Sequence, residues 1–156
     1  MKCDILISGG GIAGLAAAAA FGNAGFDVIC VDPAAPVTDG AAQGADMRST
    51  AMLQPARRVL ESAGIWNHLQ DHAAPLQIMR VVDAGGPDMV PRTTREFDAA
   101  DISEQPFGWN FPNWLLRRAL LDRFSELPNV DFRPGVSTTS LFTRTTGAKV
   151  GLSDGN

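Results

Sequence analysis

The sequence lacks three features that would each have indicated a class of function. Its 13 Lys and Arg residues against 17 Asp and Glu residues give a net charge of −4, so no basic field attracts nucleic acid, which we exclude as a partner. No apolar run approaches the roughly 20 residues that cross a bilayer. There is no low-complexity segment, and the 45% hydrophobic content is typical of a globular domain with a core.

Cysteine and histidine are also scarce. Cys3 and Cys30 are the only cysteines, and in adjacent parallel strands their offset of about three residues, at roughly 3.3 Å each, exceeds the reach of a disulfide. We therefore expect two reduced, buried thiols in a cytoplasmic protein. His68 and His72 have no third ligand nearby, so no metal site is predicted. No Ser/His/Asp or Cys/His arrangement is present, and no catalytic residue is assigned.

The sequence does contain a glycine-rich turn between two apolar runs. Residues 3–8 predict a strand that is apolar on both faces and therefore central in a parallel sheet. A helix is expected over residues 12–23, and a second strand over residues 27–32 ends at Asp32. This strand–turn–helix–strand order predicts a dinucleotide-binding unit, in which Asp32 accepts hydrogen bonds from a ribose.

Each glycine of the turn has its own expected role. Gly9 permits the tight turn out of the strand, and Gly11 has no Cβ, so a phosphate can approach the backbone. Gly14 lets the helix pack close to the strand. The first helical turn, which includes Ile12 and Ala13, offers unpaired N–H groups and the positive end of the helix dipole to the anion.

Residues 33–46 follow as a loop without a periodic pattern, and a loop of this length is usually functional or mobile. The loop leads to Arg48, which either pairs with a phosphate or stays solvated at the surface. Ser49 and Thr50 are either phosphate donors or caps of a helix, which we expect to begin at residue 50 or 55 and to end at residue 63.

Residues 76–112 do not continue the alternation of strands and helices. Strands are expected at residues 76–83 and 95–98, in a second sheet that is antiparallel. Residues 107–113 are rich in aromatic side chains, which either line a substrate pocket or belong to a strand packed at a domain junction.

The last third of the sequence predicts one helix and three strands. Asn113 opens a helix to about residue 126, either as its N-cap or in contact with a cofactor. A strand is expected at residues 130–133, and two antiparallel strands at 136–144 and 148–153. A further turn signal at the end predicts another strand beyond it, so we expect this chain to be the N-terminal part of a longer protein.

Several motifs together resemble the flavin monooxygenases. The spacing from Gly9 to Asp32 looks like their FAD-binding pattern, although the family usually has Leu at Phe21 and Glu at Asp32. Three further stretches are similar to the ubiquinone-biosynthesis hydroxylases of the para-hydroxybenzoate hydroxylase-like superfamily: Asp46-x-Arg48-Ser49-x-Ala51, Leu60-Glu61-x-x-Gly64-Ile65-Trp66 and Phe107-Gly108-Trp109-Asn110-x-Pro112-Asn113-x-x-Leu116-Arg117-x-x-Leu120. At Asn113 the family more often has Arg or Gln.

The resemblance implies an α/β fold. It comprises a Rossmann-like FAD-binding domain with a parallel sheet, an antiparallel β-meander and the start of a second, mainly β substrate domain. Residues 1–75 and 113–156 would form the FAD-binding domain, which is incomplete, and residues 76–112 would be an excursion into the substrate-domain sheet.

The resemblance also implies roles for single residues. The turn from Gly9 to Gly14 would hold the FAD pyrophosphate, and Asp32 the adenosine ribose. Arg48 would lie against the phosphates or the ribityl chain, and an amide at Asn113 could still contact FAD. The backbone of Val136 would meet the adenine.

The activity that the resemblance implies is hydroxylation of an aromatic, ubiquinone-precursor-like substrate with FAD, NAD(P)H and O2, in which the protein positions the substrate and excludes water. The isolated chain is expected to be inactive, because a second FAD motif would lie outside it. A non-catalytic nucleotide-binding fragment is the alternative. An NAD-dependent dehydrogenase is a weaker one, because residues 76–112 interrupt the usual βαβαβ order. Peripheral membrane association of the full-length protein and homo-oligomerisation are left open.

Overall fold

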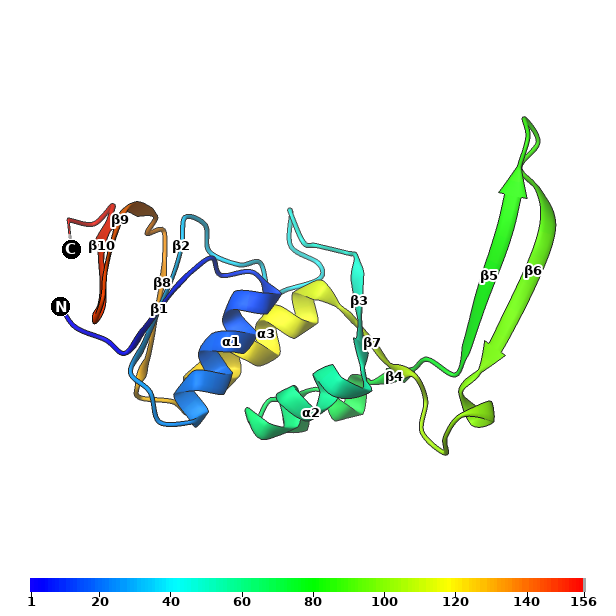
Figure 1. Cartoon of the computed structure of the whole chain (residues 1–156), viewed down its shortest axis with the longest axis horizontal. Helices are drawn as coiled ribbons and strands as arrows, with labels where there is room; N and C mark the ends of the chain where they lie inside the picture. The colour runs from blue at the N-terminus through cyan, green and yellow to red at the C-terminus, as the bar shows by residue number, and fades with distance from the viewer. Residues whose placement is uncertain (156) are drawn as a thin grey trace.

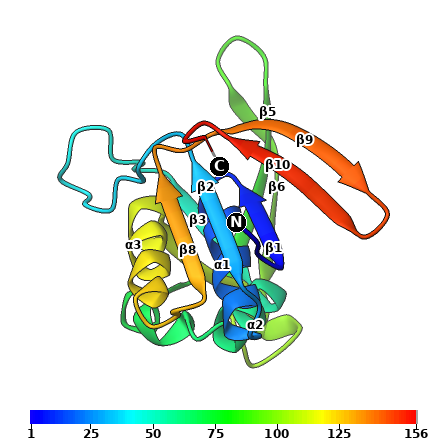
Figure 2. The ribbon, with the colours of Figure 1, turned by 90° about the vertical axis from the view of Figure 1, so that its left-hand side faces the viewer.

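The glycine turn lies in a three-layered unit. In the computed structural model, which describes residues 1–155, β1 (Ile5–Ser8), β2 (Val28–Asp32) and β8 (Val130–Pro134) form a parallel sheet in the order β1-β2-β8. Helices α1 (Ile12–Asn23) and α3 (Asn113–Phe124) cover one face, and a hairpin of β9 (Thr138–Arg144) and β10 (Gly147–Leu152) covers the other (Figures 1 and 2). The expected strand–helix–strand unit and the C-terminal antiparallel pair are confirmed.

The position of β1 differs from the prediction. Among residues 1–155, β1 pairs with β2 only and lies at the edge of the sheet, so the expectation that residues 3–8 form a central strand is wrong. The central strand is β2, which is buried on both faces. Its side chains alternate: Val28 and Cys30 point into the core beneath the helices, whereas Ile29 and Val31 pack under the hairpin with Leu152. Apolar residues alone do not distinguish the two strands, because only the pairing of β8 with β2 makes β2 central.

A second sheet lies beyond the helices. Its strands are β3 (Ser49–Leu53), β7 (Gly108–Pro112) and β4 (Ala74–Pro75), all antiparallel to their neighbours. Helix α2 (Gln54–Ser62) begins only after β3. The expectation that Ser49 or Thr50 caps a helix is therefore wrong, because both residues pair with β7 in an extended strand.

The aromatic residues of β7 belong to the core. Trp109 and Phe111 are buried, and their rings meet Trp66 edge to face, with centroids 5.2 and 6.0 Å away. Short 3-10 helices occur at residues 66–68, which include Trp66, and at residues 70–72 and 99–101. Of the two interpretations of residues 107–113, the packed strand is thus the one that the structure supports.

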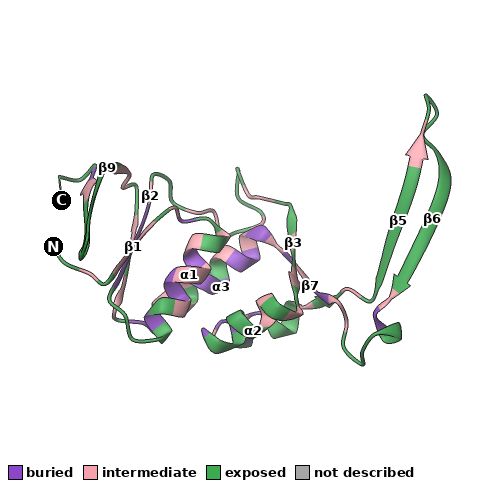
Figure 3. Cartoon of the chain, in the orientation of Figure 1, coloured by how far each residue is buried: buried purple, intermediate pink, exposed green. Residues whose placement is uncertain are grey.

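The excursion at residues 76–112 includes a long hairpin. Strands β5 (Ile78–Gly85) and β6 (Val90–Asp98) are antiparallel, as expected, and the second strand is longer than predicted. The hairpin projects from the rest of the chain, and nearly all of its residues are exposed (Figures 1 and 3). Its exposed large apolar side chains are Ile78, Met79, Val81, Val82, Met89, Val90 and Phe97.

Three smaller expectations can be checked here. Both cysteines are free, as predicted, but only Cys30 is buried, and Cys3 is half-buried. Within residues 1–155 no group of three or more metal-ligating side chains occurs, and His68 lies 3.5 Å from Glu126. None of the described helices is long and apolar enough to cross a membrane.

Candidate cofactor site

The glycine turn is held in a shape that other residues would not adopt. Gly9 has a φ of +121°, a region that favours glycine, and its N–H donates to the carbonyl of Val31 at 2.8 Å. A Cβ added to Gly14 would lie 1.9 Å from the carbonyl oxygen of Gly9, which confirms that Gly14 is needed for close helix packing. A Cβ on Gly10 would lie 2.9 Å from the Cβ of Asp32. No role of its own was predicted for Gly10, although the run of three glycines in the sequence indicates that this position too needs a residue without a Cβ.

Helix α1 begins with unsatisfied donors. Its N-cap is Gly11, no side chain caps the helix, and its first turn has no acidic residue. The first N–H groups, among them those of Ile12 and Ala13, have no partner within a helix. A Cβ at Gly11 would meet nothing within 4 Å, so the space beside these donors is open. This end of the helix can accept an anion.

Asp32 links the turn to the loop that follows β2. One carboxylate oxygen accepts the N–H of Gly10 at 2.6 Å, and the other accepts the N–H of Ala34 at 2.8 Å. The backbone carbonyl of Asp32 accepts the N–H groups of Gly135 and Val136 at 2.8 and 3.1 Å. Each carboxylate oxygen still has a free lone pair with which to accept a hydroxyl, so the predicted ribose contact is compatible with these bonds.

We expect Asp32→Asn to weaken FAD binding about 10- to 100-fold, because an amide has one acceptor oxygen and its NH2 group would face a backbone N–H. Titration of the purified protein with FAD measures the change. Asp39→Asn is the matched control, because Asp39 also accepts a loop N–H, that of Ala41 at 2.9 Å, but lies outside the glycine turn. Equal affinities of the two variants would contradict the role of Asp32.

A second cluster forms around Asp46, whose side chain is 12% exposed. Arg48 donates to both of its oxygens, from Nε at 2.9 Å and from a terminal nitrogen at 2.8 Å, and Asn113 Nδ2 donates at 3.0 Å. These bonds, those of Arg48 foremost, hold the pKa of Asp46 well below its usual range, so the carboxylate is charged at neutral pH. The side chain of Arg48 is otherwise open to solvent, at 82% exposure.

Asn113 joins this cluster to β3. It is buried, and its Oδ1 accepts the hydroxyl of Thr50 at 2.6 Å while its backbone N–H donates to the carbonyl of Arg48 at 2.8 Å. The N-cap of α3 is Pro112, so the prediction of Asn113 as N-cap is wrong: its side chain is used for Asp46 and Thr50 instead. Ser49, the first residue of β3, is exposed.

The two clusters meet at a small cavity of about 180 Å³. Gly10, Gly11 and Asp32 line it on one side, residues 34–37 of the loop close another, and Arg117 of α3 reaches it from the Asp46 cluster. The sequence analysis assigned no role to Asp46 or Arg117, although both lie within the motifs on which the family resemblance rests.

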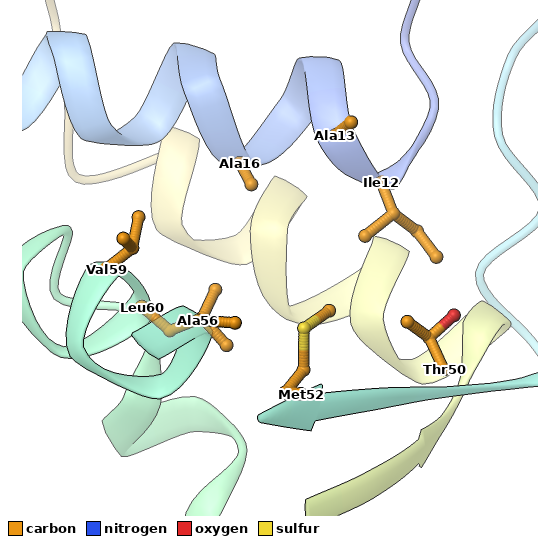
Figure 4. A pocket seen from close by; sticks show the side chains of 8 residues that line it. All are labelled: Ile12, Ala13, Ala16, Thr50, Met52, Ala56, Val59 and Leu60. Atoms are coloured by element: carbon orange, nitrogen blue, oxygen red, sulfur yellow. The ribbon is translucent and has the colours of Figure 1, made fainter. Parts of the chain in front are cut away.

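A larger, apolar cavity of about 440 Å³ lies between α1, β3 and α2 (Figure 4). Side chains of α1, β3 and α2 line it: Ile12, Ala13, Ala16, Thr50, Met52, Ala56, Val59 and Leu60. Thr50 supplies its only hydroxyl, which is bonded to Asn113. This cavity can take an uncharged group, but its lining offers no acid or base.

The buried Cys30 is not a candidate nucleophile, since burial raises the pKa of its thiol to about 11.

Comparison with known proteins identifies the family. The model of the FAD binding domain matches residues 2–156. This chain belongs to the FAD-binding domain family. It is 33% identical over 152 residues to the ubiquinone hydroxylase UbiL of Rhodospirillum rubrum, a match that covers 97% of this chain and 34% of that protein. The chain thus spans about a third of the length of the curated relative that it matches.

Solved structures share the fold of this FAD-binding chain. The flavin-dependent monooxygenase PieE, in complex with FAD and substrate, has a TM-score of 0.71 at 23% identity, over 99% of this chain and 27% of that one. PqsL of Pseudomonas aeruginosa, a probable FAD-dependent monooxygenase, has a TM-score of 0.68 at 22% identity, over 99% and 39%. The anhydrotetracycline hydroxylase OxyS of Streptomyces rimosus has 0.70 at 21%, over 99% and 29%.

The residues present fit an FAD. A diphosphate-bearing ligand would contact the uncapped start of α1 and the buried guanidinium nitrogen of Arg117 that has no partner, and the space at Gly11, where a Cβ would meet nothing within 4 Å, is open to it. The predicted residues fall into two groups: Gly9 to Gly14, Asp32 and Val136 at one end, and Arg48, Ser49 and Asn113 at the other. No residue of the second group lines the small cavity. Arg48 and Asn113 are connected to it through Asp46, which both bind and which lies 3.4 Å from the cavity residue Arg117.

Proposed function

We propose that this chain is the FAD-binding portion of a flavoprotein monooxygenase that hydroxylates an aromatic, ubiquinone-precursor-like ring with NAD(P)H and O2. The observation that carries the proposal is the match of the FAD-binding domain over residues 2–156, together with 33% identity to a ubiquinone hydroxylase. The flavin supplies the redox chemistry when it is bound.

The residues of this chain bind and orient the FAD. In this proposal the N–H groups of Gly11 to Gly14 receive the pyrophosphate, and Asp32 receives the adenosine ribose. The backbone of Val136, next to Asp32, faces the adenine. Arg48, Ser49 and Asn113 form the wall toward the ribityl chain, and the hydrogen bonds of Arg48 and Asn113 to Asp46 support this role for those two residues. No described residue of the site is assigned a proton transfer.

We further propose that residues 1–75 and 113–156 form the FAD-binding domain and that residues 76–112 begin a substrate-domain sheet. The β5–β6 hairpin supports this division, because it projects from the rest of the chain (Figure 1) and exposes apolar side chains such as Met79 and Phe97. A two-stranded hairpin is marginally stable alone, so further strands or a second copy of the chain would cover it. A cytoplasmic location is part of the proposal, which the two free cysteines support.

A non-catalytic nucleotide-binding module is the second candidate. It is favoured by one observation, that the lining of the larger, apolar cavity contains no acid or base that could act on a substrate. In that case the chain would bind FAD without turnover.

Purification of the full gene product tests both candidates. The monooxygenase should be yellow, bind FAD on titration, and consume NAD(P)H and O2 with a phenol, giving a product heavier by one oxygen in mass spectrometry. FAD uptake without consumption of NAD(P)H would favour the binding module. A colourless protein that takes up no FAD would overturn both.

A further inference from the structure

Arg117 is the one charged side chain in the cofactor cavity whose hydrogen bonding is incomplete. Its side chain is 22% exposed, and its Nε is the only buried side-chain nitrogen or oxygen without a partner within residues 1–155. A terminal nitrogen lies 3.4 Å from Asp46 Oδ2, which is a long contact for a charged pair. Buried donors without an acceptor are rare in folded proteins and call for a ligand or water.

Asp46 does not satisfy Arg117, because its carboxylate is already engaged. Arg48 binds both oxygens at 2.9 and 2.8 Å, and Asn113 donates to Oδ2 at 3.0 Å. Two guanidinium groups around one carboxylate leave a net positive charge. Asp46 therefore fixes Arg117 at the cavity without neutralising it.

The remaining lining of the cavity indicates where an anion would lie. Gly10 and Gly11 line the same cavity as Arg117 and lie at the uncapped, positive end of α1. Asp32 lines the same cavity but is negative, so it excludes an anion from its own end and favours a hydroxyl-bearing group there. A phosphate between α1 and Arg117, with a ribose toward Asp32, matches this distribution of charge.

We propose that Arg117 binds the pyrophosphate of the bound dinucleotide, opposite the glycine turn. The inference rests on the proposed FAD site and adds a residue that the glycine motif does not contain. A guanidinium supplies donors in a fixed fork that matches phosphate oxygens, and the buried Nε would gain its missing acceptor.

The neighbouring Arg118 is a matched control. It belongs to the same helix but is exposed, and its guanidinium lies 5.0 Å from the ring centre of Trp114, outside the set of residues that line the cavity. Arg117→Met and Arg118→Met remove the same charge from adjacent positions of α3. Both retain an unbranched side chain with good helix propensity.

The experiment measures the binding of FAD, ADP and riboflavin by titration of the full gene product. Arg117→Met should weaken the binding of FAD and ADP about 10- to 100-fold, the effect of losing one charge-assisted hydrogen bond, and leave riboflavin, which has no phosphate, unchanged. Arg118→Met should leave all three affinities unchanged. A folded Arg117→Met variant that binds ADP as tightly as the wild type would overturn the inference.

A second measurement needs no variant and applies if Arg117→Met does not fold. The wild-type protein is treated with phenylglyoxal, an arginine reagent, with and without ADP, and the modified arginines are identified by mass spectrometry. ADP should protect Arg117 but not Arg118; equal modification of Arg117 in both samples would refute the proposal. Failure of the wild type to bind FAD at all would instead refute the proposed function, and the inference with it.

Discussion

Gly14→Ala is expected to disrupt the first βαβ unit. The new Cβ would lie 1.9 Å from the carbonyl oxygen of Gly9 and 3.4 Å from Cγ2 of Ile7. The first contact is with backbone, so no change of rotamer relieves it, and α1 would have to move away from β1. Overpacking usually costs 1–3 kcal/mol, and we expect a loss of at least about 3 kcal/mol in the free energy of unfolding, measured by chemical denaturation.

The control for Gly14→Ala is the same substitution three residues earlier. Gly11 has a φ of −72°, and a Cβ there meets nothing within 4 Å, so Gly11→Ala should lose only about 1 kcal/mol in the free energy of unfolding, because alanine is less favourable than glycine at a helix N-cap. If Gly14→Ala is as stable as Gly11→Ala, the close contact between α1 and β1 does not exist in solution.

Gly9 and Gly14 show which part of the site can be predicted from the sequence alone. The turn, α1 and β2 are consecutive, and each is fixed by local chemistry: glycines where the backbone turns, a helix of small residues, and an apolar strand that ends at Asp32. Such features are predictable because they depend on residues close together in the chain. The expected roles of Gly9 and Gly14 are accordingly confirmed in their geometry, and the hairpins at 76–98 and 138–152 also follow from local turn signals.

The features that the sequence analysis missed depend on pairing between distant segments. Residues 49–53 form a strand because β7, about 60 residues later, pairs with them, and α2 can begin only at Gln54. The contacts of Asp46 with Asn113 and with Arg117 span 67 and 71 residues. No local pattern distinguishes such a carboxylate from one at the surface, and nothing in the sequence distinguishes Arg117 from the adjacent, solvated Arg118.

Gly11→Ala separates ligand binding from folding, and we expect it to weaken FAD binding about 5- to 150-fold while the protein stays folded. The open space at Gly11 lies beside the unpaired N–H groups of α1, in the cavity that Asp32 and Arg117 also line. A methyl group there would occupy the path by which a phosphate reaches those donors, and a steric conflict of about 1–3 kcal/mol corresponds to this range of affinity.

Riboflavin distinguishes this effect from a general distortion of the site. Because riboflavin has no phosphate, Gly11→Ala should bind it like the wild type, whereas FAD and ADP should both lose affinity in titrations of the same preparation. Gly11→Ala and Arg117→Met both change the lining of one small cavity, so their effects on ADP binding should not add, as is usual for residues that share a partner. Full additivity in the double variant would mean that the two residues contact different parts of the ligand, and unchanged FAD affinity in Gly11→Ala would place the pyrophosphate away from the glycine turn.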